Sequence, residues 1–374
     1  MDGDDDIDMF TNRGWYENPF PLRTVWEEHR QSTLSATKVG DVITSSGDIV
    51  ACGFGRLLKF VNTQGSFSQF SIAENDGYES CSLKAKDVNL DGADDFIVSS
   101  GNGLEYFKND GVGEFVLQQL VNFKSSPFDP SRTSNNINSI SIDDIDGDGW
   151  PDIVRAHHND FDDGIVEWYK YNPTTDIFGG AMKITDSHQR AYSLAVVDFN
   201  NNGFLDVVVW PQSGRTGTTV SLYENVGGDG SQWNETFLHG MPHDGTDVYG
   251  VAYDYDNDGD VDVFTSGVHD QHSFSVFHNL ETNGWEAWTE TRFSPHFDGA
   301  TITLADLDND GYLDIIQRTT EIYYEVSWWP TCTLPVQTHV VSFLIERIIN
   351  LCRDQHKITR CSLGRENGRP TCCR

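Results

Sequence analysis

The sequence predicts an all-β fold, a β-propeller of seven blades, and two observations lead to that prediction. An acidic loop of fixed internal spacing recurs along the chain, and its five copies start 52 to 57 residues apart. Short apolar segments rich in β-branched and aromatic residues flank every copy, with Gly, Asn and Asp between them. Units of this length, each holding several short strands separated by turn residues, are typical of propeller blades.

The acidic loop has the pattern Asp-x-Asp/Asn-x-Asp/Asn-Gly-x-x-Asp. Its five copies span residues 87–95, 144–152, 198–206, 254–262 and 306–314. The oxygens at positions 1, 3, 5 and 9 converge when the loop curls tightly, and the glycine at position 6 permits that curl. An all-oxygen shell suits Ca²⁺, whereas Mg²⁺ retains its waters and requires stricter octahedral geometry. We therefore expect about five Ca²⁺ sites, each between the first and second strands of a blade.

Each copy supplies predicted metal ligands at its first, third, fifth and ninth positions. These ligands are Asp87, Asn89, Asp91 and Asp95; Asp144, Asp146, Asp148 and Asp152; Asp198, Asn200, Asn202 and Asp206; Asp254, Asp256, Asp258 and Asp262; and Asp306, Asp308, Asp310 and Asp314. An EF-hand shares the first part of this pattern but requires Glu at position 12 and flanking helices. Position 12 holds Arg155, Val209, Thr265 or Gln317 in the later copies, which favours a loop between strands. The alternative for a single copy is an acidic turn without metal, and five copies in one register argue against it.

Two further units bring the total to seven. Residues 2–10 fit the loop from its third position onward, which adds Asp2, Asp4 and Asp8 to the predicted metal ligands. We expect the first blade to be truncated at the N-terminus, so that residues 7–10 lack one strand partner. Residues 40–50 form a degenerate unit that keeps a Gly-Asp pair and the apolar run but has lost the ligands.

Every unit shows four apolar runs, and we expect each run to form one strand. In the fourth unit these runs are 138–142, 152–156, 164–172 and 181–185. The third run is aromatic and ends in Asn in most units, which is typical of a strand that stops at a turn. We expect its large aromatic residues to pack between neighbouring blades rather than to stack on sugars. These residues include Trp15, Trp168 and Tyr223.

Together, the loops and strands resemble the FG-GAP/VCBS repeat propellers, a family that includes the head domain of integrin α chains and several fungal and bacterial lectins. The resemblance covers residues 1–330 and rests on the five acidic loops and the aromatic third strand. The Phe-Gly and Gly-Ala-Pro pairs that give the family its name are not kept in register. Phe54-Gly55 occurs, but Gly299-Ala300 is followed by Thr301. The chain is therefore more similar to the VCBS-like branch than to the integrins.

Residues 331–374 differ in character from the rest and are predicted to form a separate Cys-rich, basic tail. They hold five of the seven cysteines: Cys332, Cys352, Cys361, Cys372 and Cys373. Three interpretations compete, namely a disulfide-bearing cap, a metal-binding segment, or a stretch read from a wrong frame or an intron. Residues 340–351 would suit one amphipathic helix, and we expect no regular fourth strand of the last blade within residues 331–345. The sequence leaves open whether Cys52 and Cys81 pair.

The charge and the hydropathy pattern exclude several classes of partner. The formal net charge is −33 and no basic face precedes the tail, which argues against nucleic acid. No stretch is long and apolar enough to cross a membrane, and no signal peptide is recognisable. Millimolar extracellular Ca²⁺ would fill loops of this kind, whereas cytosolic Ca²⁺ would not. We therefore expect an extracellular or cell-surface protein.

The combined pattern predicts a calcium-binding module for adhesion or for binding carbohydrate or protein ligands. The alternative is a propeller enzyme, a polysaccharide lyase or a sugar dehydratase, although no complete catalytic motif is present. Its candidate bases and carboxylate-binding residues are His157, His158, His269, His272, Arg155 and Arg215. Candidate sugar-stacking residues on the surface are Trp210, Trp285 and Trp288, and Asn234 is a candidate glycosylation site. A third hypothesis is an adhesion module of a larger protein.

Overall fold

The computed structural model describes residues 9–11, 14–18, 27–30, 38–43, 48–53, 55–79, 81–112, 114–121, 139–158, 163–211, 219–240, 249–255, 258–269, 272–279, 288–293, 299–306, 313–319, 326–329, 341–343, 364–366 and 369–371. These segments consist of β-strands and short turns, together with one 3-10 turn, η1 (Asp76–Glu79). The all-β prediction is therefore confirmed. In these segments no helix is long and apolar enough to cross a membrane.

Six antiparallel sheets of four strands follow one another along the chain. In sheet order their strands are β4 (Lys38–Ile43), β5 (Asp48–Gly53), β6 (Arg56–Thr63) and β7 (Ser66–Glu74); β8 (Cys81–Lys86), β9 (Asp95–Ser100), β10 (Gly103–Asn109) and β11 (Phe115–Val121); β12 (Ser139–Asp143), β13 (Asp152–His158), β14 (Asp163–Tyr169) and β17 (Met182–Gln189); β18 (Ala191–Val197), β19 (Asp206–Pro211), β20 (Thr219–Asn225) and β21 (Trp233–Gly240); β22 (Tyr249–Tyr253), β23 (Asp262–His269), β24 (His272–Asn279) and β25 (Trp288–Phe293); and β26 (Gly299–Ala305), β27 (Asp314–Thr319), β28 (Val326–Trp329) and β29 (Val341–Phe343).

Three smaller sheets complete the described strands. A three-stranded sheet precedes the others and contains β1 (Met9–Thr11), β2 (Gly14–Glu17) and β3 (Glu27–Arg30). A short hairpin is inserted between β14 and β17, and a second hairpin lies near the C-terminus. Their strands are β15 (Tyr171–Asn172) with β16 (Ile177–Phe178), and β30 (Gly364–Glu366) with β31 (Arg369–Thr371).

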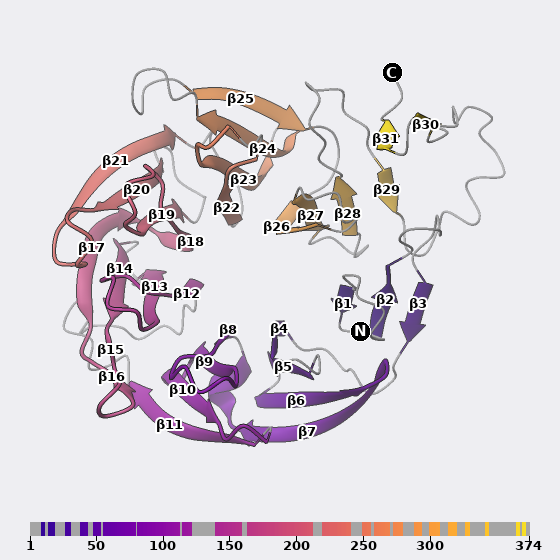
Figure 1. The fold of residues 1–374 in the computed structure, drawn as a ribbon, viewed down its shortest axis with the longest axis vertical. Coiled ribbons are helices and arrows are strands. Elements are labelled where there is room, and N and C mark those ends of the chain that lie inside the picture. Colours follow the sequence, from indigo (N-terminus) through magenta and orange to yellow (C-terminus); the bar gives the residue numbers. More distant parts are fainter. Residues whose placement is uncertain are drawn as a thin grey trace.

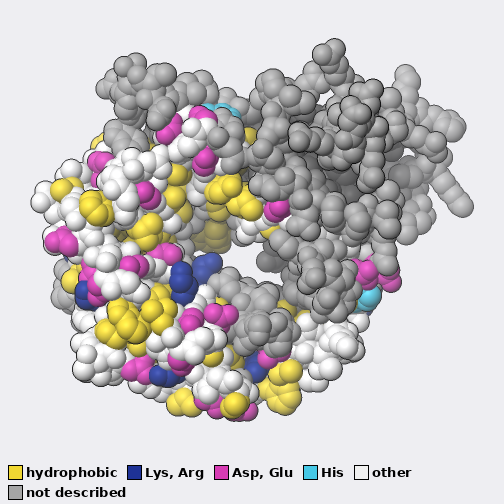
Figure 2. All heavy atoms as spheres, in the orientation of Figure 1, with side chains coloured by type: hydrophobic (Ala, Val, Ile, Leu, Met, Phe, Trp, Pro, Cys, Tyr) yellow, Lys and Arg dark blue, Asp and Glu magenta, His cyan; other side chains and the backbone are white. Residues whose placement is uncertain are grey.

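The sheets are arranged around a ring, with the first strand of each four-stranded sheet on the inside (Figure 1). These inner strands contact one another in chain order, from β4 through β8, β12, β18 and β22 to β26. The surface view shows a hollow at the centre of the ring (Figure 2). A ring of four-stranded antiparallel sheets is the arrangement of a β-propeller.

The hydrophobic core lies between neighbouring sheets, because the middle strands are buried on both faces. All residues of β9 and of β19 are buried. One cluster joins Ile97 of β9 with Ile153 of β13, and another joins Trp168 of β14 with Val207 of β19 and Tyr223 of β20. Burial on both faces explains why these strands are continuous apolar runs rather than alternating ones.

Two tryptophans on third strands join one sheet to the next through the same contact. Trp15 Nε1 donates to the carbonyl of Gly65 at 2.9 Å, and Trp168 Nε1 donates to that of Gly230 at 3.2 Å. Both glycines have positive φ, 79° and 67°, and a Cβ on them would lie 2.7 Å and 2.4 Å from the indole. Glycine alone accommodates this backbone and this approach. The predicted packing of the third-strand aromatics between blades is confirmed, since Trp15, Trp168 and Tyr223 are all buried.

The tail contributes a strand that the sequence analysis did not expect. We expected no fourth strand within residues 331–345, and this is wrong, because β29 pairs antiparallel with β28 and places Val341 opposite Trp328. The free edge of β28 presents backbone N–H and C=O groups that a short β-prone segment can satisfy. Val341–Phe343 is thus a strand rather than part of a helix over 340–351. The other residues of that predicted helix, and all five tail cysteines, lie outside the described segments.

Two other expectations concern strand pairing and cysteines. Among the described strands β1 pairs with β2, and the expected missing partner for residues 7–10 stays a prediction, because residues 1–8 lie outside the described segments. The degenerate unit nevertheless forms a complete four-stranded sheet, β4 to β7. Cys52 of β5 and Cys81 of β8 form a disulfide, so a covalent bond links two neighbouring sheets.

Candidate metal centre

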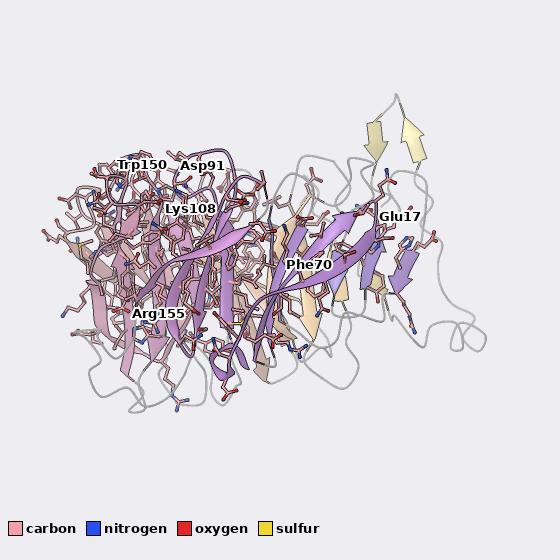
Figure 3. All side chains as sticks on the ribbon, turned by 90° about the horizontal axis from the view of Figure 1, so that it is seen from below. Glu17, Phe70, Asp91, Lys108, Trp150 and Arg155 are labelled. Atoms are coloured by element: carbon pink, nitrogen blue, oxygen red, sulfur yellow. A yellow bond between two sulfur atoms is a disulfide. The ribbon has the colours of Figure 1, made fainter. Side chains whose placement is uncertain are left out.

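The first carboxylate of each described acidic loop closes the turn. Asp87, Asp144, Asp198 and Asp254 each accept the backbone N–H groups of the fifth and sixth loop positions, at 2.8 to 3.1 Å. The side chain at position 5 then accepts the N–H of position 7 in the same four loops. The tight curl expected from the spacing is therefore present. Figure 3, which shows the ring from the side, places Asp91 and Trp150 of two such loops on the same face of the ring.

The ninth-position aspartates fasten each loop to its sheet. One carboxylate oxygen of Asp95, Asp152, Asp206 and Asp262 accepts the N–H of the second loop position at 3.0 to 3.3 Å. The other oxygen accepts a backbone N–H at or just beyond the end of the third strand at 2.8 to 2.9 Å. All four side chains are buried, and burial raises the pKa of Asp95 and Asp206 to about 6 and that of Asp152 to about 7.

The loop at 144–152 brings three carboxylates together. Asp144, Asp146 and Asp152 each place one ligand oxygen within 4.8 Å of the others. Asp146 Oδ1 is buried and has no hydrogen-bond partner in the described structure. Burial raises the pKa of Asp152, and the charges of Asp146 and Asp148 raise it further. A buried oxygen without a partner and carboxylates that repel one another are features of a cation site, so these residues fit a divalent ion.

A lysine that the sequence analysis did not assign to the site lies at this cluster. Lys170 Nζ contacts Asp146 Oδ2 and lies 2.8 Å from Asp148 Oδ2. It follows β14 directly and precedes Tyr171, whose N–H binds Asp152. The sequence feature that could have identified Lys170 is its position immediately before Tyr171, where the chain turns after β14. The ammonium group partly neutralises carboxylates that would otherwise face one another.

The degenerate second unit uses a lysine in a related way. Asp48 takes the ninth position, and its Oδ1 accepts the N–H of Asn62 at 2.9 Å. Lys59 Nζ lies 3.1 Å from Asp48 Oδ2, and the two side chains are 11% and 8% exposed. A buried carboxylate requires a nearby positive charge. Lys59 supplies that charge from within the chain, which explains how this unit keeps its sheet after losing the other acidic ligands.

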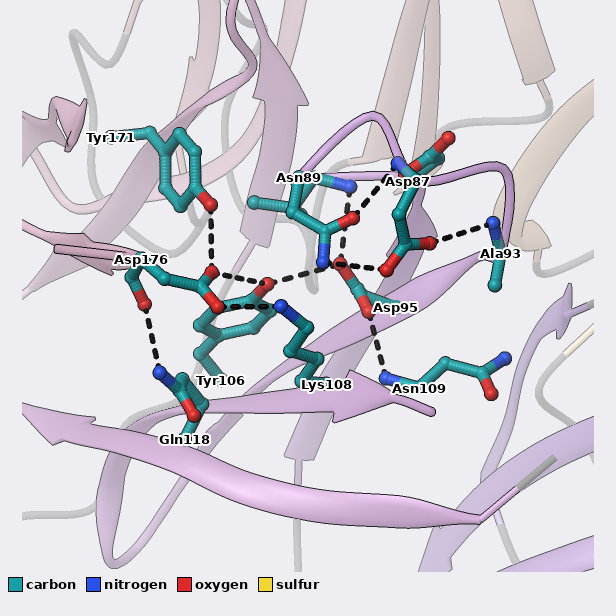
Figure 4. Close-up of polar contacts among 12 residues, drawn as sticks. Asp87, Asn89, Ala93, Asp95, Tyr106, Lys108, Asn109, Gln118, Tyr171 and Asp176 are labelled. Carbon is teal, nitrogen blue, oxygen red and sulfur yellow. Dashed lines mark hydrogen bonds and ion pairs between the residues drawn. The ribbon is translucent and has the colours of Figure 1, made fainter. Parts of the chain in front are cut away.

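The first complete acidic loop is connected to the next sheet through the β15–β16 hairpin (Figure 4). Tyr106 OH donates to Asp95 Oδ2 at 3.0 Å and lies 3.4 Å from Asp176 Oδ1. Asp176 also forms a 2.6 Å ion pair with Lys108 and accepts a 2.7 Å hydrogen bond from Tyr171 OH. Burial opposes ionisation of Asp176, but these donors outweigh it and lower its pKa. No repeat pattern marked Asp176, because the hairpin is an insertion.

The loop at 198–206 is described in full, whereas the loops at 254–262 and 306–314 are described in part. Asn200 of the loop at 198–206 donates its side-chain amide to Glu224 at 3.1 Å, while its oxygen accepts the N–H of Asn202. Asp314, the ninth position of the last loop, is buried. The remaining predicted ligands outside the described residues are Asp2, Asp4, Asp8, Asp256, Asp308 and Asp310.

Arg155 and His157, two candidate residues of the enzyme hypothesis, both contact Glu167 in the buried core. Arg155 Nη1 and His157 Nε2 lie 2.9 Å and 3.3 Å from Glu167 Oε1, which also accepts a hydrogen bond from Tyr169 OH at 2.6 Å. Arg155, His157 and Glu167 are buried. Burial would raise the pKa of Glu167, but the His157 hydrogen bond and the Arg155 charge lower it to about 2. This buried network fits a structural role, since no substrate would reach it.

Of the remaining surface candidates, Trp210 is buried and Asn234 is exposed. Trp210 is not an exposed sugar platform, because β19 is buried on both faces and Trp210 Nε1 donates to Thr265 Oγ1 at 3.2 Å. Asn234, the candidate glycosylation site, is exposed on β21. Arg215 and Trp285, and the side chains of His158, His269, His272 and Trp288, lie outside the description.

Several solved structures share this fold. The chain is similar to a lectin from Agrocybe aegerita, reported to recognise non-reducing terminal N-acetylglucosamine, with a TM-score of 0.57 and 19% identity over 82% of this chain and 79% of the lectin. It is similar to the lectin BP39L from Burkholderia pseudomallei, with a TM-score of 0.58 and 12% identity over 90% of this chain and 91% of that one. It is also similar to a periplasmic gluconolactonase from Pseudomonas aeruginosa, with a TM-score of 0.59 and 11% identity over 91% and 95% of the two chains. At sequence identities of 11 to 19%, these structural similarities show that the fold is shared and nothing more.

Sequence comparison identifies the family. Curated proteins gave no match. The profile of the FG-GAP-like repeat matches four overlapping segments, residues 87–155, 144–209, 198–265 and 254–316, and each segment begins at an acidic loop. Together the segments cover more than half of the chain, so the chain belongs to the FG-GAP-like repeat family.

Proposed function

We propose that the chain is a calcium-stabilised propeller of seven blades that binds carbohydrate outside the cell. Six four-stranded sheets and the three-stranded sheet β1 to β3 support the number of blades. In this proposal the acidic loops lie between the first two strands of the blades that carry them. The function is that of a binding module rather than an enzyme.

The observation that carries the calcium proposal is the cluster of Asp144, Asp146 and Asp152. Their converging oxygens and the unpartnered Oδ1 of Asp146 fit an ion held by oxygen ligands alone. A bound Ca²⁺ would supply positive charge that offsets the cost of burying Asp152. Equivalent hydrogen bonds in the other described loops support sites there too. Sites of this kind fill at extracellular calcium levels, which supports a secreted or cell-surface location.

The carbohydrate proposal is supported by the fold and not by a described sugar site. Two of the similar structures are lectins that share most of their length with this chain. The enzyme alternative loses support, because Arg155 and His157 are buried against Glu167. An extracellular protein ligand, as in adhesion, is the alternative that a glycan array without any binding would favour.

The two parts of the proposal need separate measurements. Thermal unfolding with excess Ca²⁺ or with chelator should show a melting temperature several degrees higher with Ca²⁺, because the ion binds the folded state. Asp146→Asn should reduce that difference, whereas Asn234→Gln should leave it unchanged. A melting temperature insensitive to chelator would refute the calcium proposal. Binding to a glycan array with and without Ca²⁺ tests the carbohydrate proposal, and failure to bind any glycan while the protein remains folded would refute it.

A further inference from the structure

We infer that Glu17, Glu27 and His29 form a second kind of metal site, one for a transition-metal ion such as Zn²⁺. Each residue offers one ligand atom, and these atoms lie within 4.8 Å of one another. The three residues lie on β2 and β3 and belong to none of the acidic loops. Figure 3 shows Glu17 well apart from Asp91 and Trp150, so the site is separate from the loops that contain those two residues.

The pairing of β2 with β3 brings the three residues to one face of the sheet. Trp15 is opposite His29, and Glu17 is opposite Glu27. Positions two apart on a strand share a face, so all four side chains are on the same side. Like charges directly opposite each other destabilise a strand pair, and a cation between Glu17 and Glu27 would reverse the sign of that interaction.

The imidazole of His29 is held in place by its neighbour. It stacks on the Trp15 indole with a centroid distance of 4.0 Å and an interplanar angle of 8°. Trp15 is itself buried and fixed by its hydrogen bond to Gly65 of the next sheet. His29 Nε2 lies 3.0 Å from Glu17 Oε2. The ligand orientation is thus largely set before an ion binds, which reduces the entropy lost on binding.

The donor set selects the class of metal. One imidazole nitrogen and two carboxylates are typical ligands of Zn²⁺ and related ions, whereas Ca²⁺ takes oxygen ligands. Metal–ligand bonds of about 2.0–2.2 Å allow two ligands of one ion to be at most about 4.4 Å apart. A small closure of the cluster therefore suffices. Glu27 is exposed, which leaves room for water to complete the coordination shell.

The test is a calorimetric titration of Zn²⁺ into the full chain with the acidic loops saturated by Ca²⁺. Wild type, Glu27→Gln, His29→Asn and the exposed control Glu114→Gln are compared, with unfolding curves showing that each is folded. We expect wild type and the control to share one Zn²⁺ binding step that weakens at least about tenfold in both ligand variants. With Co²⁺ in place of Zn²⁺, wild type should develop a visible absorption band that His29→Asn lacks.

A simple ion pair between protonated His29 and Glu17 would give a different result. All four proteins would then bind Zn²⁺ with the same isotherm, or none would bind it below millimolar concentration, and either outcome overturns the inference. Glu27→Gln separates the two cases most directly, because Glu27 is an exposed residue and its replacement removes a ligand without removing the His29–Glu17 contact.

Discussion

Replacing Lys170 with Met should strengthen cation binding by the acidic loop at 144–152. The Lys170 ammonium contacts Asp146 and lies 2.8 Å from Asp148, both predicted ligands of the ion. A divalent ion entering the loop must displace this ammonium group or bind close to its positive charge, which repels the ion. Methionine keeps the length and most of the packing of the side chain while removing the charge. If the loop binds calcium as proposed, Lys170 competes with the ion for Asp146 and Asp148.

The magnitude follows from the exposure of the pair. Lys170 is 42% exposed, so water screens its two contacts. Ion pairs of this kind are worth about 0.2–1 kcal/mol each, which gives about 0.5–2 kcal/mol for two. Since 1.4 kcal/mol corresponds to a tenfold change in affinity, the Kd of this loop should fall by about 2- to 30-fold.

Trp150 makes this single loop observable among several. It occupies the seventh loop position, next to the predicted ligands, and should sensitise the luminescence of Tb³⁺ bound there, a hard cation that takes the same oxygen ligands as Ca²⁺. Competition of Ca²⁺ against Tb³⁺, with excitation where tryptophan alone absorbs, reports the loop affinity, and Trp150→Phe should abolish the signal. Lys183→Met is the matched control, because Lys183 forms a 2.9 Å ion pair with Asp186 away from the loop. An affinity that is unchanged or weaker in Lys170→Met would refute the reasoning.

Three further predictions test the packing and the buried charges. Gly230→Ala should destabilise the fold by about 2–5 kcal/mol, because a Cβ would lie 2.4 Å from the Trp168 indole and φ is +67°. Gly227 also has a positive φ but open space around it, so Gly227→Ala should cost about 1–2 kcal/mol. Equal losses of unfolding free energy for the two variants in denaturant would contradict this. Burial lowers the pKa of His188 to about 4, so the unfolded state takes up the proton first as the pH falls. The free energy of unfolding should therefore decrease by about 3 kcal/mol between about pH 6.5 and pH 4. If the unfolding free energy of His188→Gln falls as steeply with pH as that of wild type, the prediction is wrong. Lys59→Met should lower the free energy of unfolding by about 3–5 kcal/mol with or without Ca²⁺, since it leaves the buried carboxylate of Asp48 without its counter-charge. If Ca²⁺ restores the stability of this variant, the degenerate unit still binds the ion and the prediction is wrong.

The repeated features of the fold were predictable, because each follows from a local pattern. The Gly at loop position 6 and the Asp at position 1 determine a turn whose hydrogen bonds lie within the loop itself. The aromatic third strand ends at an Asn because the Asn side chain caps the next turn, as Asn225 does for Gly230. Such contacts span few residues, so spacing alone reveals them.

Features that depend on contacts between sheets were not predictable in the same way. Trp210 was a candidate for an exposed sugar-stacking residue, yet it is buried and its indole N–H donates to Thr265 of the next sheet. Arg155 and His157, two of the six candidates of the enzyme hypothesis, meet because positions two apart on a strand share a face, but alternation does not distinguish a groove from an interface between sheets. The strand β29 follows from an unfilled sheet edge, which no local pattern in the tail indicates.

The ninth-position aspartate explains why the repeat tolerates loss of its ligands. In five described units this carboxylate, Asp48, Asp95, Asp152, Asp206 or Asp262, accepts a backbone N–H at or just beyond the end of the third strand, and this task does not need a metal. The buried charge does need a counter-charge. The degenerate unit keeps Asp48 and supplies Lys59, so it retains the hydrogen bond and places an ammonium group beside the buried carboxylate. The aspartate is therefore fixed by the architecture of the sheet, and we propose that the rest of the loop determines whether an ion or a lysine neutralises it.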